Sequence, residues 1–276
     1  MRTAASVSLT AIVRPPSAAL ARCELTHLAR EVIDVSRAQA QHAAYCALLG
    51  ALGAEVEVLT PEPDLPDAVF VEDVAVVLDE LAVLTNPGAK SRRAEVAAVA
   101  AALERHRPVH HMPPPATLDG GDVVVVDREI YVGRSTRTNA EGIAWLRDLL
   151  APSGYRVAGV AVGACLHLKS ACTYLGNGLL VANPDWVDIG AFGGLEIVPV
   201  SAAEPRAANT FRVGEAVVMA DGFPQTRARI EARGCDVHAV DLSELQKAEA
   251  AGSCMSLVFN RGERVPAGLR VGSAPR

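Results

Sequence analysis

The sequence predicts an α/β fold built as a circular array of five similar units. Short apolar runs typical of strands recur along the whole chain, with alanine-rich helical patterns between them. A polar residue also precedes a short apolar strand at five positions, in steps of 49, 45, 42 and 45 residues: Asp73, Asp122, His167, Asn209 and Cys254. Units repeated at such a period favour a closed array in which these polar residues converge on one axis. An ordinary α/β sandwich is the alternative.

Local patterns define the elements of the first half. An apolar strand at 9–13 ends before Pro15, because proline disfavours its continuation. Alanines and leucines recur at helical spacing over 35–52, and Gly53 ends that helix. The other expected elements up to residue 150 are strands 56–59, 74–78, 81–84, 109–111, 123–126 and 130–132 and helices 92–105 and 140–150.

The second half repeats the theme. Two apolar runs, 172–175 and 179–181, flank Gly176-Asn177-Gly178 and predict a hairpin. The remaining expected elements are strands 157–162, 197–200, 210–213, 216–219, 235–240 and 255–259, a helix at 224–233 and a short helix at 243–248. After about residue 262 the chain turns polar and small, so we expect a frayed end.

The amino-acid composition limits which kinds of ligand and which cellular compartment fit this protein. Half of the 276 residues are apolar, and the net charge is -6. This charge argues against nucleic acid or an anionic membrane and is compatible with a small cationic ligand. No segment approaches the ~18 uninterrupted apolar residues of a membrane helix. Six cysteines without a C-x-x-C pair indicate reduced thiols in a cytoplasmic protein.

The central motif is Asp119-Gly120-Gly121-Asp122, which is followed at once by the apolar run 123–126. Two adjacent glycines allow positive φ or a close approach to another group. The motif therefore places two carboxylates at a turn against the start of a core strand. Taken alone, the same letters also describe an Asx-type turn that caps a strand.

The chemistry comes from the polar residues that the array brings together. A cysteine near a histidine, with an acid to orient the ring, is the arrangement for a thiolate nucleophile and a proton shuttle. Additional carboxylates raise the pKa of a thiol, so they indicate a cationic substrate rather than a protease site. The expected cluster consists of Glu72, Asp73, Asp119, Asp122, His167 and Cys254. Taken singly, Cys254 and His167 are also compatible with buried structural roles.

The sequence indicates neither a metal nor an organic cofactor. His106, His110 and His111 lack thiol or carboxylate partners at ligand-like spacing. No Walker or dinucleotide-binding glycine pattern is present.

Ordered segments along nearly the whole chain carry a family resemblance. They are LPDAVFVED at 65–73, PGA at 87–89, SRRAEV at 91–96, TLDGGDV at 117–123, RTN at 137–139, LHLKS at 166–170, and Cys254. With these segments the chain resembles the dimethylarginine dimethylaminohydrolases of the guanidino-group modifying superfamily. The resemblance implies a five-bladed α/β propeller of the pentein type, with residues 1–276 as one catalytic domain.

The resemblance also implies the catalytic roles. Cys254 would attack the guanidinium carbon, and His167 would protonate the departing amine and then activate water. Asp119 would orient His167 and stabilise its charge. Asp73 would hold the guanidinium, with Glu72 beside it.

Further residues would hold the substrate by the same resemblance. Arg92 and Arg137 would bind the α-carboxylate. Asp67 and the backbone carbonyl of Leu25, on a lid loop, would take the α-amine, and the backbone of Ala248 would face the guanidino end. The expected substrates are small methylated arginines, converted to citrulline and an alkylamine without a cofactor. The sequence does not determine the oligomeric state, and a homodimer is one assembly that it allows.

Two other functions stay open at this point. An arginine deiminase uses the same fold and thiol chemistry, but such enzymes are longer and have H-L-D where this chain has His167-Leu168-Lys169. A non-catalytic protein that binds cationic amino acids is the second. The presence of Cys254, His167 and Asp119 together argues against this second function.

Overall fold

Five three-stranded sheets of one plan form the frame of the computed structural model, which describes residues 9–261. In each sheet the middle strand is antiparallel to the first strand and parallel to the third. The sheets are β15-β1-β2, β3-β4-β5, β6-β7-β8, β9-β10-β11 and β12-β13-β14. The strands are β1 Leu9–Val13, β2 Ala54–Val58, β3 Ala75–Val77, β4 Ala82–Leu84, β5 Val109–His111, β6 Val123–Val126, β7 Glu129–Arg134, β8 Arg156–Ala161, β9 Cys172–Gly176, β10 Leu179–Ala182, β11 Glu196–Pro199, β12 Thr210–Val213, β13 Ala216–Ala220, β14 Asp236–Val240 and β15 Ser256–Asn260.

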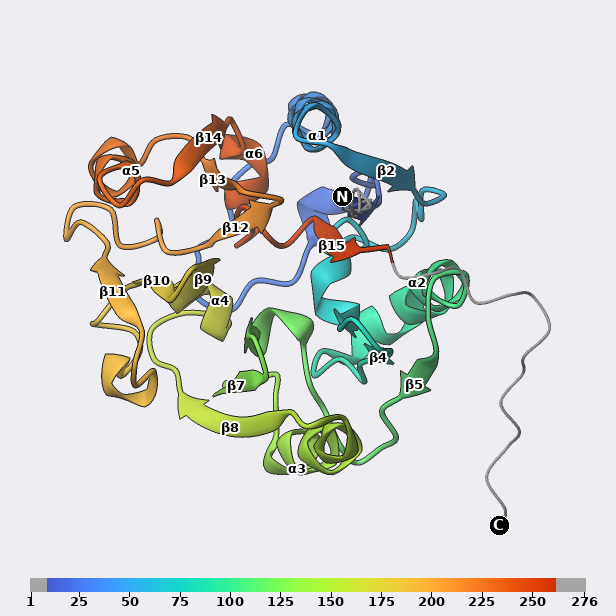
Figure 1. Cartoon of the computed structure of the whole chain (residues 1–276). Helices are drawn as coiled ribbons and strands as arrows, with labels where there is room; N and C mark the ends of the chain where they lie inside the picture. Colours follow the sequence, from blue (N-terminus) through green and yellow to red (C-terminus); the bar gives the residue numbers. More distant parts are fainter. Residues whose placement is uncertain (1–8, 262–276) are drawn as a thin grey trace, which may run out of the picture.

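The first sheet joins the two ends of the described chain. β15 pairs antiparallel with β1, with Leu9 opposite Asn260 and Val13 opposite Ser256. The sheets follow one another around a common centre, and β2, β5, β8, β11 and β14 lie on the outside (Figure 1). Every predicted strand overlaps an observed strand, which confirms the α/β class.

Helices cover the outer sides of most sheets (Figure 1). They are α1 Val35–Ala51, α2 Val96–Leu103, α3 Ala140–Leu150 and α5 Pro224–Glu231, whereas α4 Leu168–Ala171 lies nearer the centre and α6 Ser243–Gln246 contacts α1. The predicted helix 92–105 begins instead as a 3-10 helix over Lys90–Glu95, where Arg92 is bound by acidic partners. Between β10 and β11 the chain forms the short 3-10 helix Ile189–Ala191 and no long helix.

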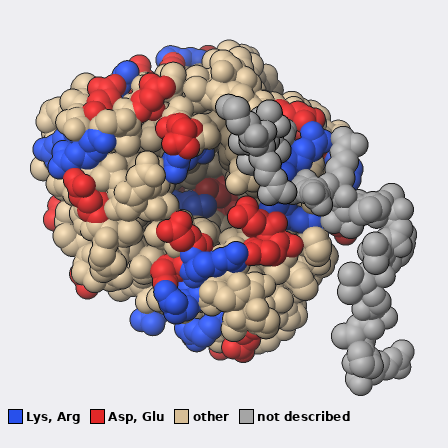
Figure 2. All heavy atoms as spheres, viewed as in Figure 1, with Lys and Arg blue, Asp and Glu red and all other residues tan. Residues whose placement is uncertain are grey.

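The first strands of all five sheets meet at the centre. Residues of β3, β6, β9, β12 and β15 line one cavity of about 170 Å³. Seen as in Figure 1, the surface is hollowed near its centre, and basic and acidic side chains lie in and around the hollow (Figure 2). The five repeated polar residues precede these five strands, as the spacing in the sequence predicts, with α4 between His167 and β9.

Two sequence predictions concern features outside this frame. The frayed end after about residue 262 lies outside the described residues. Within residues 9–261, every helix is too short or too polar to cross a membrane.

The first sheet generates a stability prediction. Ile12 on β1 is fully buried and packs in a cluster with Leu84, Leu257 and Phe259. Replacing it with alanine leaves a cavity where the two ends of the chain meet, so Ile12→Ala should lower the free energy of unfolding by about 2–5 kcal/mol. Urea denaturation measures this loss. Val58→Ala, at a 58% exposed position of β2, is the matched control and should change it by about 0.5 kcal/mol or less. Equal losses would contradict the packing.

Candidate functional site

Two glycines bring the central motif against the segment that carries Asp73. A Cβ atom on Gly120 would lie 2.0 Å from the carbonyl oxygen of Glu72. On Gly121 it would lie 2.6 Å from Nδ1 of His167 and 2.7 Å from Oδ1 of Asp73. Only glycine fits at these positions, which confirms the close approach expected from the motif. The short 3-10 helices Val71–Val74 and Gly120–Asp122 are thereby packed together.

The two aspartates of the motif have different surroundings. Asp119 is fully buried, accepts a hydrogen bond from the Gly88 N–H at 2.9 Å and lies 3.1 Å from Nε2 of His167. Asp122 instead accepts hydrogen bonds from the backbone N–H of Leu168 and from the hydroxyls of Ser135 and Thr138. Asp122 therefore fixes the surrounding loops, and Asp119 is the carboxylate that reaches the imidazole.

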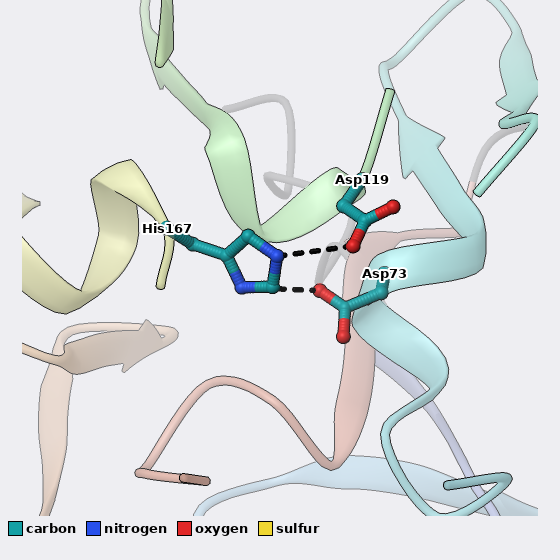
Figure 3. Close-up of side chains that lie close together, drawn as sticks. All are labelled: Asp73, Asp119 and His167. Carbon is teal, nitrogen blue, oxygen red and sulfur yellow. Dashed lines mark hydrogen bonds and ion pairs between the residues drawn. The ribbon is translucent and has the colours of Figure 1, made fainter. Parts of the chain in front are cut away.

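His167 lies between two carboxylates that come from different sheets (Figure 3). Besides the contact to Asp119, its Nδ1 is 3.7 Å from Oδ1 of Asp73. Burial lowers the pKa of His167, but the charge of Asp73 and the hydrogen bond to Asp119 outweigh burial and raise the pKa to about 9. The ring is therefore a cation at neutral pH, ready to donate a proton.

Cys254 precedes β15 and lines a small cavity together with His167 and Asp73. Its sulfur accepts a hydrogen bond from the Ala251 N–H at 3.4 Å. Burial raises the pKa of Cys254 strongly, and the charges of Glu72 and Asp73 raise it further. The resting side chain is thus a neutral thiol.

Glu72 lies beside Cys254 on the side of the axial cavity. Its backbone N–H donates to the Cys254 carbonyl at 3.2 Å. Its carboxylate accepts hydrogen bonds from Lys169 at 2.6 Å and from the Ser253 hydroxyl at 2.8 Å. Both carboxylate oxygens of Glu72 are therefore occupied before any substrate binds.

Arg92 is buried among acidic groups and backbone carbonyls. It forms an ion pair with Asp73 and a second one, of 2.7 Å, with Glu95. The same guanidinium donates to the carbonyl oxygens of Asp67 and Phe70. All three nitrogen atoms of the Arg92 guanidinium thus have protein partners. Arg92 therefore holds Asp73 and Glu95 in place, and it also lines the cavity.

The residues predicted to hold the amino-acid end of a substrate lie under the segment around Leu25. Both carboxylate oxygens of Asp67 accept from the Glu24 N–H at 3.2 Å. Arg137 donates to the Thr26 hydroxyl at 3.2 Å. Arg137 also lies 3.9 Å from Asp119, so it connects this end of the site with the imidazole.

Most of the predicted residues face one cavity of about 20 Å³. Among the predicted residues, Asp67, Asp73, Arg92, Arg137, His167, Ala248 and Cys254 line it. Asp119 stands behind His167, Glu72 lies on the axial side, and Leu25 itself is not part of the wall. The other lining residues, which were not predicted, are Glu24, Phe70, Leu166, Glu249 and Ala250. These five belong to no catalytic pattern, so only their proximity to predicted residues pointed to them.

Asp73, Asp119 and His167 offer ligand atoms within 4.8 Å of one another, which is close enough for a metal ion. Their surroundings oppose this use. A metal requires the neutral imidazole, whereas both carboxylates favour the proton on His167. Asp73 is in addition paired with Arg92. The arrangement fits a buried imidazolium better than a metal centre.

Comparisons with known proteins agree on one family. A sequence model described as "N,N dimethylarginine dimethylhydrolase, eukaryotic" matches residues 22–188. The N(G),N(G)-dimethylarginine dimethylaminohydrolase of Streptomyces coelicolor is 40% identical over 251 residues, which are 91% of this chain and 96% of that protein.

Two solved structures extend this similarity. A cysteine-to-serine mutant of the Pseudomonas aeruginosa enzyme, complexed with citrulline, has a TM-score of 0.87 at 34% identity and covers 91% of this chain and 98% of that one. A histidine-to-glycine dimethylarginine dimethylaminohydrolase, as an adduct with S-methyl-L-thiocitrulline, has a TM-score of 0.86 at 34% identity and covers 91% and 99%.

The raised pKa of His167 predicts how stability depends on pH. The folded protein keeps this proton up to about pH 9, whereas an unfolded histidine loses it near pH 6.5. The stabilisation is therefore complete below pH 6.5 and is lost as the pH rises through about 9. We expect the difference in unfolding free energy between wild type and His167→Gln to shrink by roughly 1–3 kcal/mol between pH 6 and 9.5.

Urea denaturation at several pH values tests this expectation. His110→Gln, at an exposed position, is the control and should follow the wild-type curve. Parallel curves for wild type and His167→Gln would contradict a buried imidazolium.

Proposed function

The chain belongs to the N,N-dimethylarginine dimethylhydrolase family, and we propose that it hydrolyses Nω-methylated arginines to citrulline and dimethylamine or methylamine. It is a hydrolase of C–N bonds. The observation that carries this function is the pairing of a neutral Cys254 thiol with a cationic His167 in one acidic cavity. Such a cavity favours a guanidinium, whose charge the carboxylates balance.

The first half of the reaction forms a covalent intermediate. The guanidinium of the substrate lies beside Cys254, its positive charge favours the thiolate, and the thiol proton leaves to solvent. The sulfur then bonds to the guanidinium carbon and gives a tetrahedral adduct. His167 transfers its proton to the methylated nitrogen, the C–N bond breaks, and dimethylamine departs. A cationic S-alkylthiouronium remains on Cys254, and His167 is now neutral.

The second half returns the enzyme to its starting state. The neutral His167 takes a proton from water, and the resulting hydroxide attacks the thiouronium carbon. The C–S bond breaks while the hydroxyl of this adduct gives up its proton, and that proton goes to the departing sulfur, so citrulline leaves and Cys254 is again a neutral thiol beside a protonated His167. Asp119 and Asp73 hold the ring of His167 in place in both half-reactions.

Recognition of the guanidino end falls to Asp73 and Glu72, with the backbone of Ala248 on the opposite wall. Asp73 and Ala248 both line the cavity, which supports their assignment to the guanidino end. Glu72 contributes mainly its charge, because its oxygens are already bonded to Lys169 and Ser253.

Recognition of the amino-acid end falls to four residues. Arg137 and Arg92 bind the α-carboxylate, and Asp67 binds the α-amine together with the carbonyl oxygen of Leu25. The side chains of Asp67, Arg92 and Arg137 line the cavity, which supports this assignment.

We assign the fold to the five-bladed α/β propellers, with the chain as one catalytic domain. The five sheets of equal plan and their first strands around one cavity support this assignment. A cytoplasmic homodimer completes the proposal. All six cysteines are unpaired, as expected in a reducing compartment. The exposed Ile189, on the 3-10 helix Ile189–Ala191, is the kind of side chain that a second copy would cover.

A panel of guanidines tests the function. The protein should release citrulline from asymmetric dimethylarginine and monomethylarginine faster than from arginine, and a chelator should leave the rate unchanged. Cys254→Ser should lose at least about a thousandfold, because a hydroxyl ionises far less readily than a thiol. Cys235→Ser, away from the cavity, is the matched control. A colorimetric citrulline assay measures all of these rates.

Other results would point to the alternatives. Faster turnover of arginine would make the protein a deiminase, and binding without turnover would make it a binder of cationic amino acids. Acid-quench mass spectrometry with His167→Gly and a guanidine that has a good leaving group should find the adduct on Cys254. An adduct on another cysteine would contradict the mechanism.

The amino-acid end generates a separate prediction. Arg137→Ala should raise KM for dimethylarginine by about ten- to a hundredfold, since a charge-assisted pair is lost. Methylguanidines without a carboxylate should hardly respond. Arg92→Ala should impair both kinds of substrate, because it also leaves Asp73 and Glu95 without their partner. Arg134→Ala, at an exposed position, is the control. Equal losses for both substrates in Arg137→Ala would mean that this arginine only supports the fold.

A further inference from the structure

Residues 24–28, which we call the lid segment, are bound at three successive positions by an acidic side chain that has no role in the mechanism above. The carboxylate of Glu249 accepts hydrogen bonds from three successive backbone N–H groups, those of Thr26, His27 and Leu28. The contact to Thr26 measures 3.0 Å. Three successive N–H groups that converge on one point form a binding site for an anion.

The backbone of Glu249 is specialised for this contact. Its φ is +58°, in the left-handed region that residues other than glycine rarely adopt. Ala248 and Ala250, on either side of it, line the cavity together with Glu249. The strained residue thus directly adjoins the guanidino end of the site, while its side chain reaches the lid segment.

The lid segment touches the residues that we propose for the amino-acid end. The Glu24 N–H donates to Asp67, and the Thr26 hydroxyl accepts from Arg137. Ser91 also donates to the carboxylate of Glu24 at 2.6 Å. The position of the lid segment therefore determines what Asp67 and Arg137 can offer to a substrate.

A closed lid segment leaves too little space for a substrate. The cavity of about 20 Å³ has room for roughly one water molecule. A methylated arginine must therefore displace part of the wall as it enters. Glu24 brings the lid segment to this wall, and three of its five residues, Glu24, Thr26 and His27, are exposed.

We propose that Glu249 is a positioning residue that closes the lid segment over the amino-acid end of the substrate. The proposal rests on the proposed function. The hydrogen bonds from the three N–H groups to Glu249 fix the position of the lid segment. In that position the carbonyl of Leu25 and the carboxylate of Asp67 can both accept hydrogen bonds from the α-amine. Without the Glu249 carboxylate, these N–H groups turn to water and the lid segment stays open.

Steady-state kinetics test the role in binding. Glu249→Ala should lower kcat/KM for dimethylarginine by about tenfold or more, mainly through KM. The same ratio for a methylguanidine without the amino-acid moiety should change by less than about twofold, because it does not use the lid segment. Glu249→Gln keeps one acceptor oxygen and should fall between wild type and Glu249→Ala. Glu104→Ala, which removes an exposed acidic side chain outside the site, is the control.

Limited trypsin digestion tests the lid segment without reference to activity. Cleavage after Arg30 should be faster in Glu249→Ala than in wild type and in Glu104→Ala, at an unchanged melting temperature. If Glu249→Ala fails to fold, the isosteric Glu249→Gln serves in both experiments.

The outcomes separate the two proposals. No citrulline from wild type would overturn the proposed function, while faster digestion of Glu249→Ala would still support the closure by Glu249. An active wild type with unchanged KM and digestion in Glu249→Ala would overturn the role of Glu249. Equal losses for both substrates would also overturn it, because they would indicate general damage to the site.

Discussion

The neutralisation of buried charge is the constraint on which the site depends. Asp73 and Glu95 are buried beside Arg92, and Asp119 is buried beside His167. A buried charge without a partner costs several kcal/mol, so each of these groups requires the others. The 3-10 helices that carry Asp73 and Arg92 are consequently held together by the ion pairs that shape the cavity. A substitution that removes one of these charges therefore also changes the shape of the cavity.

The repeated plan of the sheets explains why the reacting groups are so far apart in the sequence. Asp73, His167 and Cys254 each precede the first strand of a different sheet, and the first strands meet around one cavity. Pairing of β1 with β15 closes the arrangement and brings Cys254 to the others. The nucleophile is therefore positioned by β15, the last strand of residues 9–261, so the site is complete only when β15 has paired with β1.

Local patterns predicted the fold well, because strand and helix signals are short-range. The strand at 123–126 and the helix at 140–150 have the expected bounds. The start of α2 differed, because the contacts of Arg92 with distant acids fix a 3-10 turn there. The sequence did not distinguish Asp119, which contacts His167, from Asp122, which binds the surrounding loops, because the difference depends on the direction of each side chain. No sequence pattern indicated the role of Glu249, because its partners are backbone N–H groups more than 200 residues away in the sequence.

The hydrogen bonds of Glu72 give a physical reason for the preference for methylated substrates that we propose. An unsubstituted guanidinium has N–H groups on both terminal nitrogens, and each needs an acceptor when it is buried. In this site Lys169 and Ser253 each already donate to one carboxylate oxygen of Glu72, so fewer of its acceptor sites remain for the N–H groups of arginine. An unpaired buried N–H costs about 1–3 kcal/mol. A dimethylated nitrogen has no N–H to satisfy, so it avoids this cost, and the occupied Glu72 still contributes negative charge near the cation.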